Sequence, residues 1–186
     1  KCGNSTISKK CGRRICRSIR RTAHRKARYS AAQHMRIAVL AIGRARGDPS
    51  AQLFMDYMAR LPWPYELREL QENKPLKAEK RKAREAELLL GAVPERAVAV
   101  ALDGGGRMLS SADFAKRIGA WRDDGAPCLA FLIGGADGHG DQVLKQADLT
   151  LSLGPMVWPH LLVRAMLAEQ LWRAASILSG HPYHRA

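Results

Sequence analysis

Residues 151–174 read LSLGPMVWPHLLVRAMLAEQLWRA, and this stretch constrains the fold more than any other part of the chain. It begins as a short apolar strand that gives way to a loop at Gly154 and Pro155. A long helix follows from Pro159 to about Ser179, and it is apolar on nearly every side. A strand, a glycine loop and a buried helix in this order indicate an α/β architecture.

Two further segments place glycines where a predicted strand ends. They read LDGGG at residues 102–106 and FLIGGADG at residues 131–138. A glycine backbone can lie flat against a small planar ligand because no side chain intervenes. In a parallel sheet these ends and Leu153 to Pro155 converge at the carboxyl edge. The pattern predicts a ligand held mostly by main-chain groups.

Apolar strands alternate with amphipathic helices from Met35 onward. Asp48 is suited to cap a helix that has Pro49 at its first position, and Tyr65 to Leu70 alternates as an edge strand does. The alternation predicts a parallel sheet with helices on both faces. The expected strands are residues 37–42, 65–70, 96–103, 128–135 and 149–153, and the expected helices are residues 49–59, 76–90, 111–123, 142–147 and 159–179.

The last of these helices leaves little polar surface. A helix of this kind is buried on more than one side, and in a chain this small a second subunit can supply the second side. We therefore predict a homodimer, with a central helix inside a single core as the alternative. Glu169 and Arg173 lie four residues apart in the favourable order and are expected to pair on the helix surface.

The charge of +14 is unevenly distributed over the 186 residues. Residues 1–34 contain 11 Lys and Arg and no Asp or Glu, so everything from Met35 onward carries only +3. This basic segment has too little apolar content to order itself, and we expect it to be disordered. It can be an RNA-gripping arm, an organelle transit peptide, a metal-binding segment or residues translated upstream of a true start at Met35. We favour the last, with one domain spanning residues 35–186.

The cysteine spacing and the hydropathy of the sequence bear on metal binding, membrane insertion and cellular location. The wide spacing of Cys2, Cys11, Cys16 and His24 argues against a structural zinc site, and we predict no metal. Cys128 begins an apolar strand and is expected to be a buried small hydrophobe. No stretch reaches the roughly 20 apolar residues of a membrane span. We expect a cytoplasmic protein, or an organellar one if the basic segment is a transit peptide.

The familiar nucleotide-binding motifs do not occur at these strand ends. Gly104 and Gly106 are followed by Leu109 where G-x-G-x-x-G requires a third glycine. Gly135 and Gly140 have the spacing of a P-loop, but Asp141 stands where the lysine belongs. An acidic residue there repels phosphate, so a nucleotide phosphate is not the expected ligand.

Five motifs from Met35 to the end occur in an order that resembles one family. They are MRIAVLAIG, VALDGGGRMLSS, LIGGADG, the stretch quoted first, and HPYHRA at residues 181–186. Together they are similar to the RlmH family of SPOUT-class methyltransferases, which methylate N3 of a pseudouridine in 23S ribosomal RNA. The resemblance implies a parallel α/β sheet with a C-terminal trefoil knot, a homodimer, and action on the assembled large subunit or 70S ribosome.

The resemblance also implies S-adenosyl-L-methionine as cofactor. Two departures from the family bear on its side-chain contacts. Val157 replaces a common threonine, and residues 137–140 differ from the commoner loop. The implied cofactor-binding positions are Leu102, Gly134, Leu153, Gly154, Pro155, Met156, Val157 and Trp158.

The catalytic candidates lie in the last residues. His184 is the first choice to accept the proton of the target N–H, because a neutral histidine can do so near neutral pH. Arg185 is expected to pair with a phosphate or a base carbonyl, and Tyr183 to stack on an extruded base. His160 either caps the following helix or faces the cofactor. Arg164 is a candidate RNA or interface contact, with an arginine exposed to solvent as the alternative.

Two other functions remain open from the sequence. One is a ribosome- or RNA-binding protein that keeps the fold without catalysis. The net charge of only +3 over residues 35–186 favours recognition of one RNA site by its shape over non-specific electrostatic binding to RNA. The other is a SPOUT methyltransferase with a different RNA target. Binding of S-adenosylmethionine separates the first from an enzyme, and the identity of the methylated nucleoside separates the second.

Overall fold

The computed structural model describes residues 35–183, so the expected disordered extension at residues 1–34 and the candidates His184 and Arg185 lie outside the described residues. Its centre is a five-stranded sheet in the order β2-β1-β4-β3-β5, with every neighbouring pair parallel. The parallel α/β prediction is confirmed, and the expected edge strand 65–70 lies at one edge of the sheet. The strands are β1 (Arg36–Ile42), β2 (Tyr65–Leu70), β3 (Val98–Met108), β4 (Cys128–Ile133) and β5 (Leu149–Ser152).

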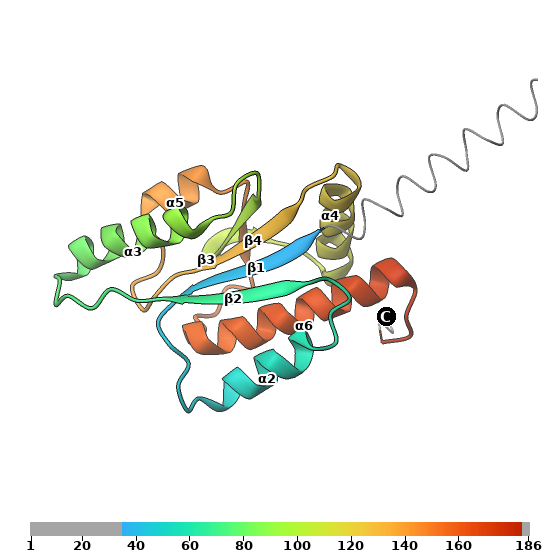
Figure 1. Cartoon of the computed structure of the whole chain (residues 1–186), viewed down its shortest axis with the longest axis horizontal. Helices are drawn as coiled ribbons and strands as arrows, with labels where there is room; N and C mark the ends of the chain where they lie inside the picture. Colours follow the sequence, from blue (N-terminus) through green and yellow to red (C-terminus); the bar gives the residue numbers. More distant parts are fainter. Residues whose placement is uncertain (1–34, 184–186) are drawn as a thin grey trace, which may run out of the picture.

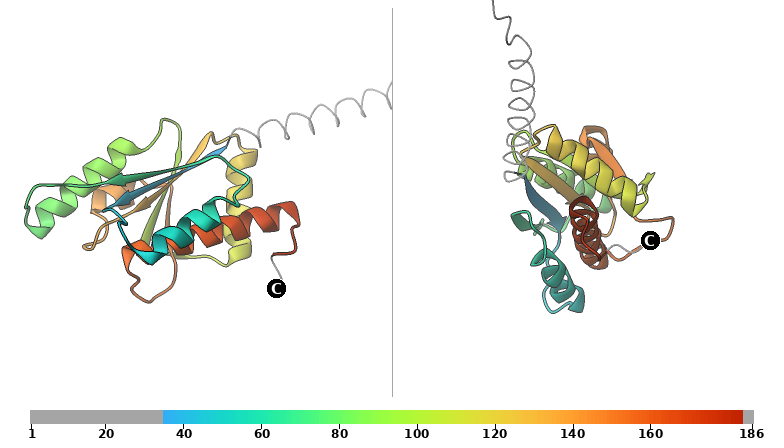
Figure 2. Two further views of the ribbon diagram at one scale, coloured as in Figure 1. Left: turned by 60° about the horizontal axis from the view of Figure 1, so that its bottom comes forward. Right: turned by 90° about the vertical axis from the view of Figure 1, so that its right-hand side faces the viewer.

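Helices cover both faces of this sheet (Figures 1 and 2). Helices α2, α4 and α6 pack on one face, and α3 and α5 pack on the other. Asp48 caps α2 as expected, since its carboxylate accepts a hydrogen bond from the Ser50 N–H at 2.8 Å. The helices are α2 (Pro49–Met58), α3 (Ala78–Ala92), α4 (Ser111–Asp123), α5 (Asp141–Gln146) and α6 (His160–Ser179).

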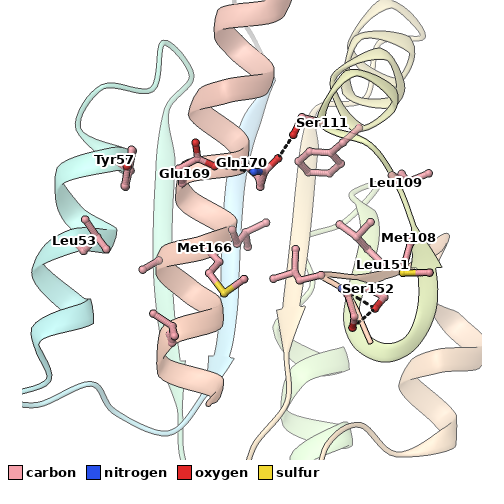
Figure 3. Close-up of a pocket in the computed structure, with 16 residues that line it drawn as sticks. Leu53, Tyr57, Met108, Leu109, Ser111, Leu151, Ser152, Met166, Glu169 and Gln170 are labelled. Atoms are coloured by element: carbon pink, nitrogen blue, oxygen red, sulfur yellow. Dashed lines mark hydrogen bonds between the residues drawn. The ribbon is translucent and has the colours of Figure 1, made fainter. Parts of the chain in front are cut away.

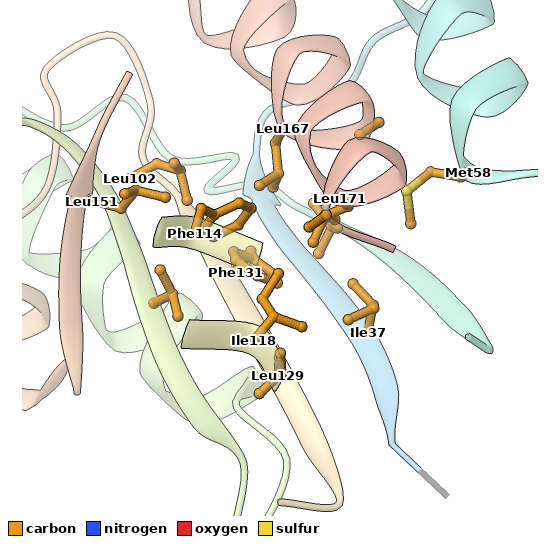
Figure 4. Close-up of a cluster of buried hydrophobic side chains, with 14 of the residues drawn as sticks. Ile37, Met58, Leu102, Phe114, Ile118, Leu129, Phe131, Leu151, Leu167 and Leu171 are labelled. Atoms are coloured by element: carbon orange, nitrogen blue, oxygen red, sulfur yellow. The ribbon is translucent and has the colours of Figure 1, made fainter. Parts of the chain in front are cut away.

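The core consists of two layers separated by the sheet. Along β1, Ile37 and Val39 face α6, whereas Ala38 and Leu40 face α3, as the strand's alternation requires. The larger layer is shown in Figure 4, where Phe114 of α4 meets Phe131 of β4 edge to face with ring centroids 6.2 Å apart. Cys128 is 1% exposed, and its expected role as a buried hydrophobe is confirmed.

Strand β3 is longer than the expected strand, which ended at residue 103. It continues through the glycines to Met108, because Arg107 and Met108 pair with β5 after a register shift. The shift brings two backbones together at Gly106, where an added Cβ would lie 2.8 Å from backbone atoms of Thr150 and Leu151. Only glycine allows this approach, so the glycine run is part of the sheet rather than a loop.

Helix α6 begins at the carboxyl edge of the sheet and runs back across its face (Figure 1). Small and branched residues such as Ala168 and Leu171 are buried in the core, while Leu162, Met166 and Trp172 are half-buried on another side. No helix among residues 35–183 has the length and hydrophobicity that a membrane crossing requires.

Candidate functional site

A cavity of about 440 Å³ opens at the carboxyl edge of the sheet. This size lies within the range of small-molecule sites. All eight expected cofactor positions line it. The prediction that the glycine-bearing strand ends meet at one edge of the sheet is therefore confirmed. The lining residues are Leu102, Asp103, Gly104, Ile133, Gly134, Gly135, Ala136, Gly138, Leu151, Leu153, Gly154, Pro155, Met156, Val157, Trp158, His160 and Val163.

The loop after β4 forms one wall of the cavity. It makes a tight turn in which the Gly138 N–H donates to the Gly135 carbonyl at 3.1 Å, and Gly138 has a φ of +73°. An added Cβ on Gly134 would lie 3.0 Å from the Gly138 carbonyl carbon. A side chain at residue 134 would therefore require the loop to shift, and with glycine there the loop presents main chain to the cavity.

The turn after β5 forms the facing wall. The Ser152 hydroxyl donates to the Gly154 carbonyl at 3.0 Å and accepts the Gly154 N–H at 3.2 Å, which fixes the turn. Gly154 has a φ of +121°, a conformation that residues with a side chain rarely adopt. Beyond it Val157 is 98% exposed, so the departure from threonine at this position alters no packing within the chain.

Two buried polar side chains lie behind the β4 loop. The His139 Nε2–H donates to the Leu132 carbonyl at 3.2 Å, and burial lowers the pKa of this histidine, so it is neutral. Glu85 of α3 is 8% exposed, and burial raises the pKa of its carboxyl. An added Cβ on Gly135 would lie 2.8 Å from Glu85 Oε2, so the carboxylate occupies the space where a side chain at 135 would go.

Arg164 is 2% exposed, and its guanidinium forms hydrogen bonds with groups of its own chain. It donates to the Glu69 carboxylate at 2.7 Å and to the carbonyls of Ile42 and Gly43 at 2.9 Å each. The Glu69 carboxylate also accepts the Ala45 N–H, and these hydrogen bonds lower the pKa of Glu69 although burial alone would raise it. This structural role replaces the RNA or interface contact that we expected for Arg164.

His160, one turn earlier on α6, lines the cavity. Its side chain makes no capping hydrogen bond, and its Nε2 would lie 3.4 Å from a Cβ added at Gly43. Burial and the nearby Arg164 charge lower the pKa of His160, which favours the neutral ring. Of the two expected roles, the structure supports the one in which the ring faces the ligand site.

A second cavity, of about 520 Å³, adjoins the first at Leu151, Leu153 and Gly154. Figure 3 shows it between α2, α6 and the β3–α4 connection, with apolar walls such as Leu53 and Met166. Its polar end is ordered by hydrogen bonds, since Ser111 donates to Gln170 at 2.8 Å and Gln170 donates to Glu169 at 2.7 Å.

The described end of the chain folds back onto α6. The Tyr183 hydroxyl donates to the Glu169 carboxylate at 3.2 Å, and Arg173 Nε donates to the same oxygen at 2.9 Å, so the expected pair of Glu169 and Arg173 is confirmed. The tyrosine ring also lies 5.8 Å from that of Trp172. Burial, a hydrogen bond with Tyr57 and the Glu169 charge raise the pKa of Tyr183 to about 12.

The structure does not bring Tyr183 to the cofactor positions of its own chain. Helix α6 has 20 residues and spans ~30 Å at about 1.5 Å per residue. His160 begins the helix beside the cavity, while Tyr183 packs against Glu169, nine residues or ~14 Å further along the helix, and does not line the cavity. Among the described residues, Tyr183 and the candidate cofactor positions therefore lie apart.

Sequence reasoning missed Glu85 and His139. Glu85 occurs in a run of charged helix residues, AEKRKAREAE, where nothing marks one carboxylate as buried. His139 stands between two glycines in a loop that was noted only for departing from the family pattern. A signal did exist for Glu85: it lies four residues before the buried Leu89 and therefore on the face of α3 that packs against the sheet.

Comparison with known proteins defines the class of this chain. Residues 35–184 match the family model described as "Predicted SPOUT methyltransferase", and the chain belongs to this family of methyltransferases. A protein of Paramagnetospirillum magneticum, named ribosomal RNA large subunit methyltransferase H, is 58% identical over 151 residues, which cover 81% of this chain and 99% of the relative. The proteins of that name from Rhodospirillum centenum and Rhodospirillum rubrum are 54% and 48% identical over 152 residues, covering 82% of this chain and all of each relative.

Proposed function

We propose that this protein transfers a methyl group from S-adenosyl-L-methionine to N3 of a pseudouridine in 23S ribosomal RNA of the assembled large subunit or 70S ribosome. Membership of the SPOUT methyltransferase family and the names of the relatives support the reaction class and an RNA substrate. The observation that carries the proposal within this structure is the main-chain cavity at the carboxyl edge, whose walls are the expected cofactor positions.

The cavity fits such a cofactor in the character of its walls. The close backbone approach at Gly134 and the lining glycines Gly135 and Gly154 leave a surface on which a flat heterocycle meets peptide groups rather than side chains. Leu102, Leu151 and Leu153 contribute apolar contact, and Asp103 is the one carboxylate among the lining residues. When bound, S-adenosylmethionine supplies a methyl group already activated on a sulfonium, so the chain mainly has to orient it.

The chain's own part in the reaction is positioning and proton removal. His160, the first residue of α6, lines the cavity, and its lowered pKa favours the neutral ring. From this position it can contact the cofactor or the target base. We assign His184 to accept the N3 proton, Arg185 to bind a phosphate or base carbonyl, and Tyr183 to stack on the extruded base. His184 and Arg185 lie outside the described residues.

These roles require a second copy of the chain. Tyr183 packs against Glu169, nine residues or ~14 Å along α6 from His160, and it does not line the cofactor cavity of its own chain. We infer that the last residues of one protomer serve the cavity of its partner. The half-buried side of α6 and the adjoining apolar cavity offer a surface for that partner. We therefore propose a homodimer with the active site completed across its interface.

Three further expectations belong to the same proposal. The last part of the chain forms a trefoil knot around the cofactor cavity. The enzyme acts in the cytoplasm, where ribosomes are assembled and used. Its functional domain begins at Met35, the residue at which the match to the family model also begins.

The test is methyl transfer from labelled S-adenosylmethionine to ribosomes isolated from a strain lacking this protein. We expect incorporation into 23S RNA, with N3-methylpseudouridine identified by mass spectrometry of the nucleosides. Incorporation into another nucleoside would point to a different RNA target. Cofactor binding without incorporation would mean a wrong substrate, and absence of cofactor binding by calorimetry would favour a non-catalytic ribosome-binding protein.

A further inference from the structure

A dense group of cations lies at the start of α3. Residues 74–84, KPLKAEKRKAR, contain six Lys and Arg and one Glu, although residues 35–186 together carry only +3. The excess charge of the domain is therefore concentrated in one short segment. This segment precedes the buried Glu85, whose carboxyl lies beside Gly135 of the β4 loop.

Two of the six cations are used to fix the segment in place. Arg81 donates through Nε to the Asp137 carboxylate at 3.0 Å, which ties the first turn of α3 to the loop that walls the cofactor cavity. Arg84 donates to Glu72 at 3.1 Å, which ties the same helix to the connection that precedes it. The buried face of α3, with Ala86 and Leu89, packs in the core, and these exposed pairs add contacts to the segments on either side.

Three others are left to the solvent. Lys74, Lys77 and Lys80 are exposed, and none of them forms an ion pair with a carboxylate of residues 35–183. Lys77 and Lys80 are three residues apart and therefore share one side of the helix start. These three lysines are called the α3 lysine group below.

The α3 lysine group lies beside the entrance of the cofactor cavity. Both Figure 1 and the left view of Figure 2 show the first turns of α3 projecting beyond the carboxyl ends of β1 and β2. The Arg81–Asp137 pair links this projection directly to residues 135–138, of which Gly135, Ala136 and Gly138 line the cavity. Any polyanion that reaches the cavity from this side passes the lysines.

We propose that the α3 lysine group is the surface that binds the phosphate backbone of the ribosomal RNA next to the target nucleotide. This inference rests on the proposed function and adds the docking surface to it. Lysine ammonium groups bind phosphates as point charges without reading bases, so they supply affinity while the cavity supplies selectivity. Because the anchoring contacts hold α3 against the β4 loop, RNA bound there is also positioned relative to the methyl donor.

The test compares two triple variants that each remove three positive charges. One carries Lys74→Ala, Lys77→Ala and Lys80→Ala. The control carries Lys116→Ala, Arg117→Ala and Arg122→Ala on α4, which covers the opposite face of the sheet. Binding to isolated ribosomes is measured between 50 and 200 mM salt, together with methyl-transfer kinetics and calorimetric binding of S-adenosylmethionine.

The α3 variant is expected to bind ribosomes about tenfold more weakly at low salt and to lower the slope of log affinity against log salt by about 2 to 3. Its KM for ribosomes should rise while cofactor binding is unchanged, and the α4 control should behave as the wild type. Equal salt slopes for the two variants would overturn the inference. Weakened binding to ribosomes with normal binding to naked 23S RNA would also overturn it, since it would indicate a ribosomal protein as partner. If wild-type protein transferred no methyl group to ribosomes, the proposed function itself would fail.

Discussion

The two adjoining cavities differ in which atoms form their walls, main chain in one and side chains in the other. The cofactor cavity is walled by glycine-bearing strand ends, with Gly134, Gly138 and Gly154 in tight or left-handed conformations. The second cavity is walled by side chains of α2 and α6, with Glu169 and Gln170 at its polar end. A main-chain wall is sensitive to added atoms and indifferent to the identity of exposed side chains. A side-chain wall depends on identity and on the hydrogen bonds between its members.

The largest expected effect is that of Arg164→Ala, because its guanidinium is buried and donates three hydrogen bonds one turn after His160, which lines the cofactor cavity. Its loss leaves Glu69 and two strand-end carbonyls without their donor. We expect about 2–4 kcal/mol less stability in denaturant unfolding. Cofactor affinity should fall as His160 and Gly43 shift, while the high pKa of Tyr183 is kept.

The matched control for Arg164 is Arg68→Ala, which removes an arginine whose ion pair with Glu66 is exposed. Exposed pairs contribute at most about 1 kcal/mol, so this variant should unfold almost as the wild type does. Similar losses for both variants would show that the burial of Arg164 has no energetic consequence.

The next effect tests how little space the main-chain wall allows. Gly106→Ala places a Cβ 2.8 Å from the β5 backbone, which must move to accept it. We expect about 1–3 kcal/mol less stability and, since β5 leads into the cofactor cavity, at least a tenfold weaker affinity for S-adenosylmethionine, or about 1.4 kcal/mol. Gly91→Ala on α3, with no atom within 4 Å of the added Cβ and outside the cofactor cavity, should reduce neither quantity.

The third effect concerns the side-chain wall and its pH dependence. The Tyr183 pKa is about 12 against an ordinary value of 10, so its protonated form is favoured in the folded protein. The stability that this provides is complete below pH 10 and is lost as the pH rises from about 10 to about 12. Ultraviolet titration should show one late-ionising tyrosine that is missing in Tyr183→Phe.

Glu169→Gln refines this titration, because it removes the charge that opposes tyrosinate formation while keeping an acceptor for the hydroxyl. The late ionisation should then move to lower pH. A tyrosine that still titrates late in Tyr183→Phe would assign the high pKa to another residue.

The smallest effect is expected at Val157, whose side chain is 98% exposed at the rim of the main-chain wall. Val157→Thr restores the residue common in the family and should change stability by less than about 0.5 kcal/mol and cofactor affinity by less than about twofold. Calorimetry with S-adenosylmethionine measures the second quantity. A much larger gain in affinity would mean that a threonine hydroxyl contributes to the wall, and the contrast between the two cavities would weaken.

Much of the cofactor cavity was predictable because its signal is local. Glycines at strand ends are visible in the sequence, and parallel strands bring their carboxyl ends to one edge. The roles of Arg164 and Glu85 were not predictable in this way. The partner of Arg164 is Glu69, 95 residues earlier, and no periodicity within α6 or β2 records that the two meet. The extension of β3 likewise depends on a register shift against β5, which neither strand specifies alone.

By itself, the sequence determined the order and type of the elements, the parallel sheet, the glycine-lined edge and the methyltransferase family that the chain resembles. These follow from local periodicity, turn residues and motif order, each of which is complete within a short window of residues. Only the tertiary structure decided that Arg164 is buried, that the Glu85 carboxyl fills the space beside Gly135, and that Tyr183 packs against Glu169, ~14 Å along α6 from His160. Burial, pairing and distance depend on which distant segments pack together, and that packing is a property of the whole core.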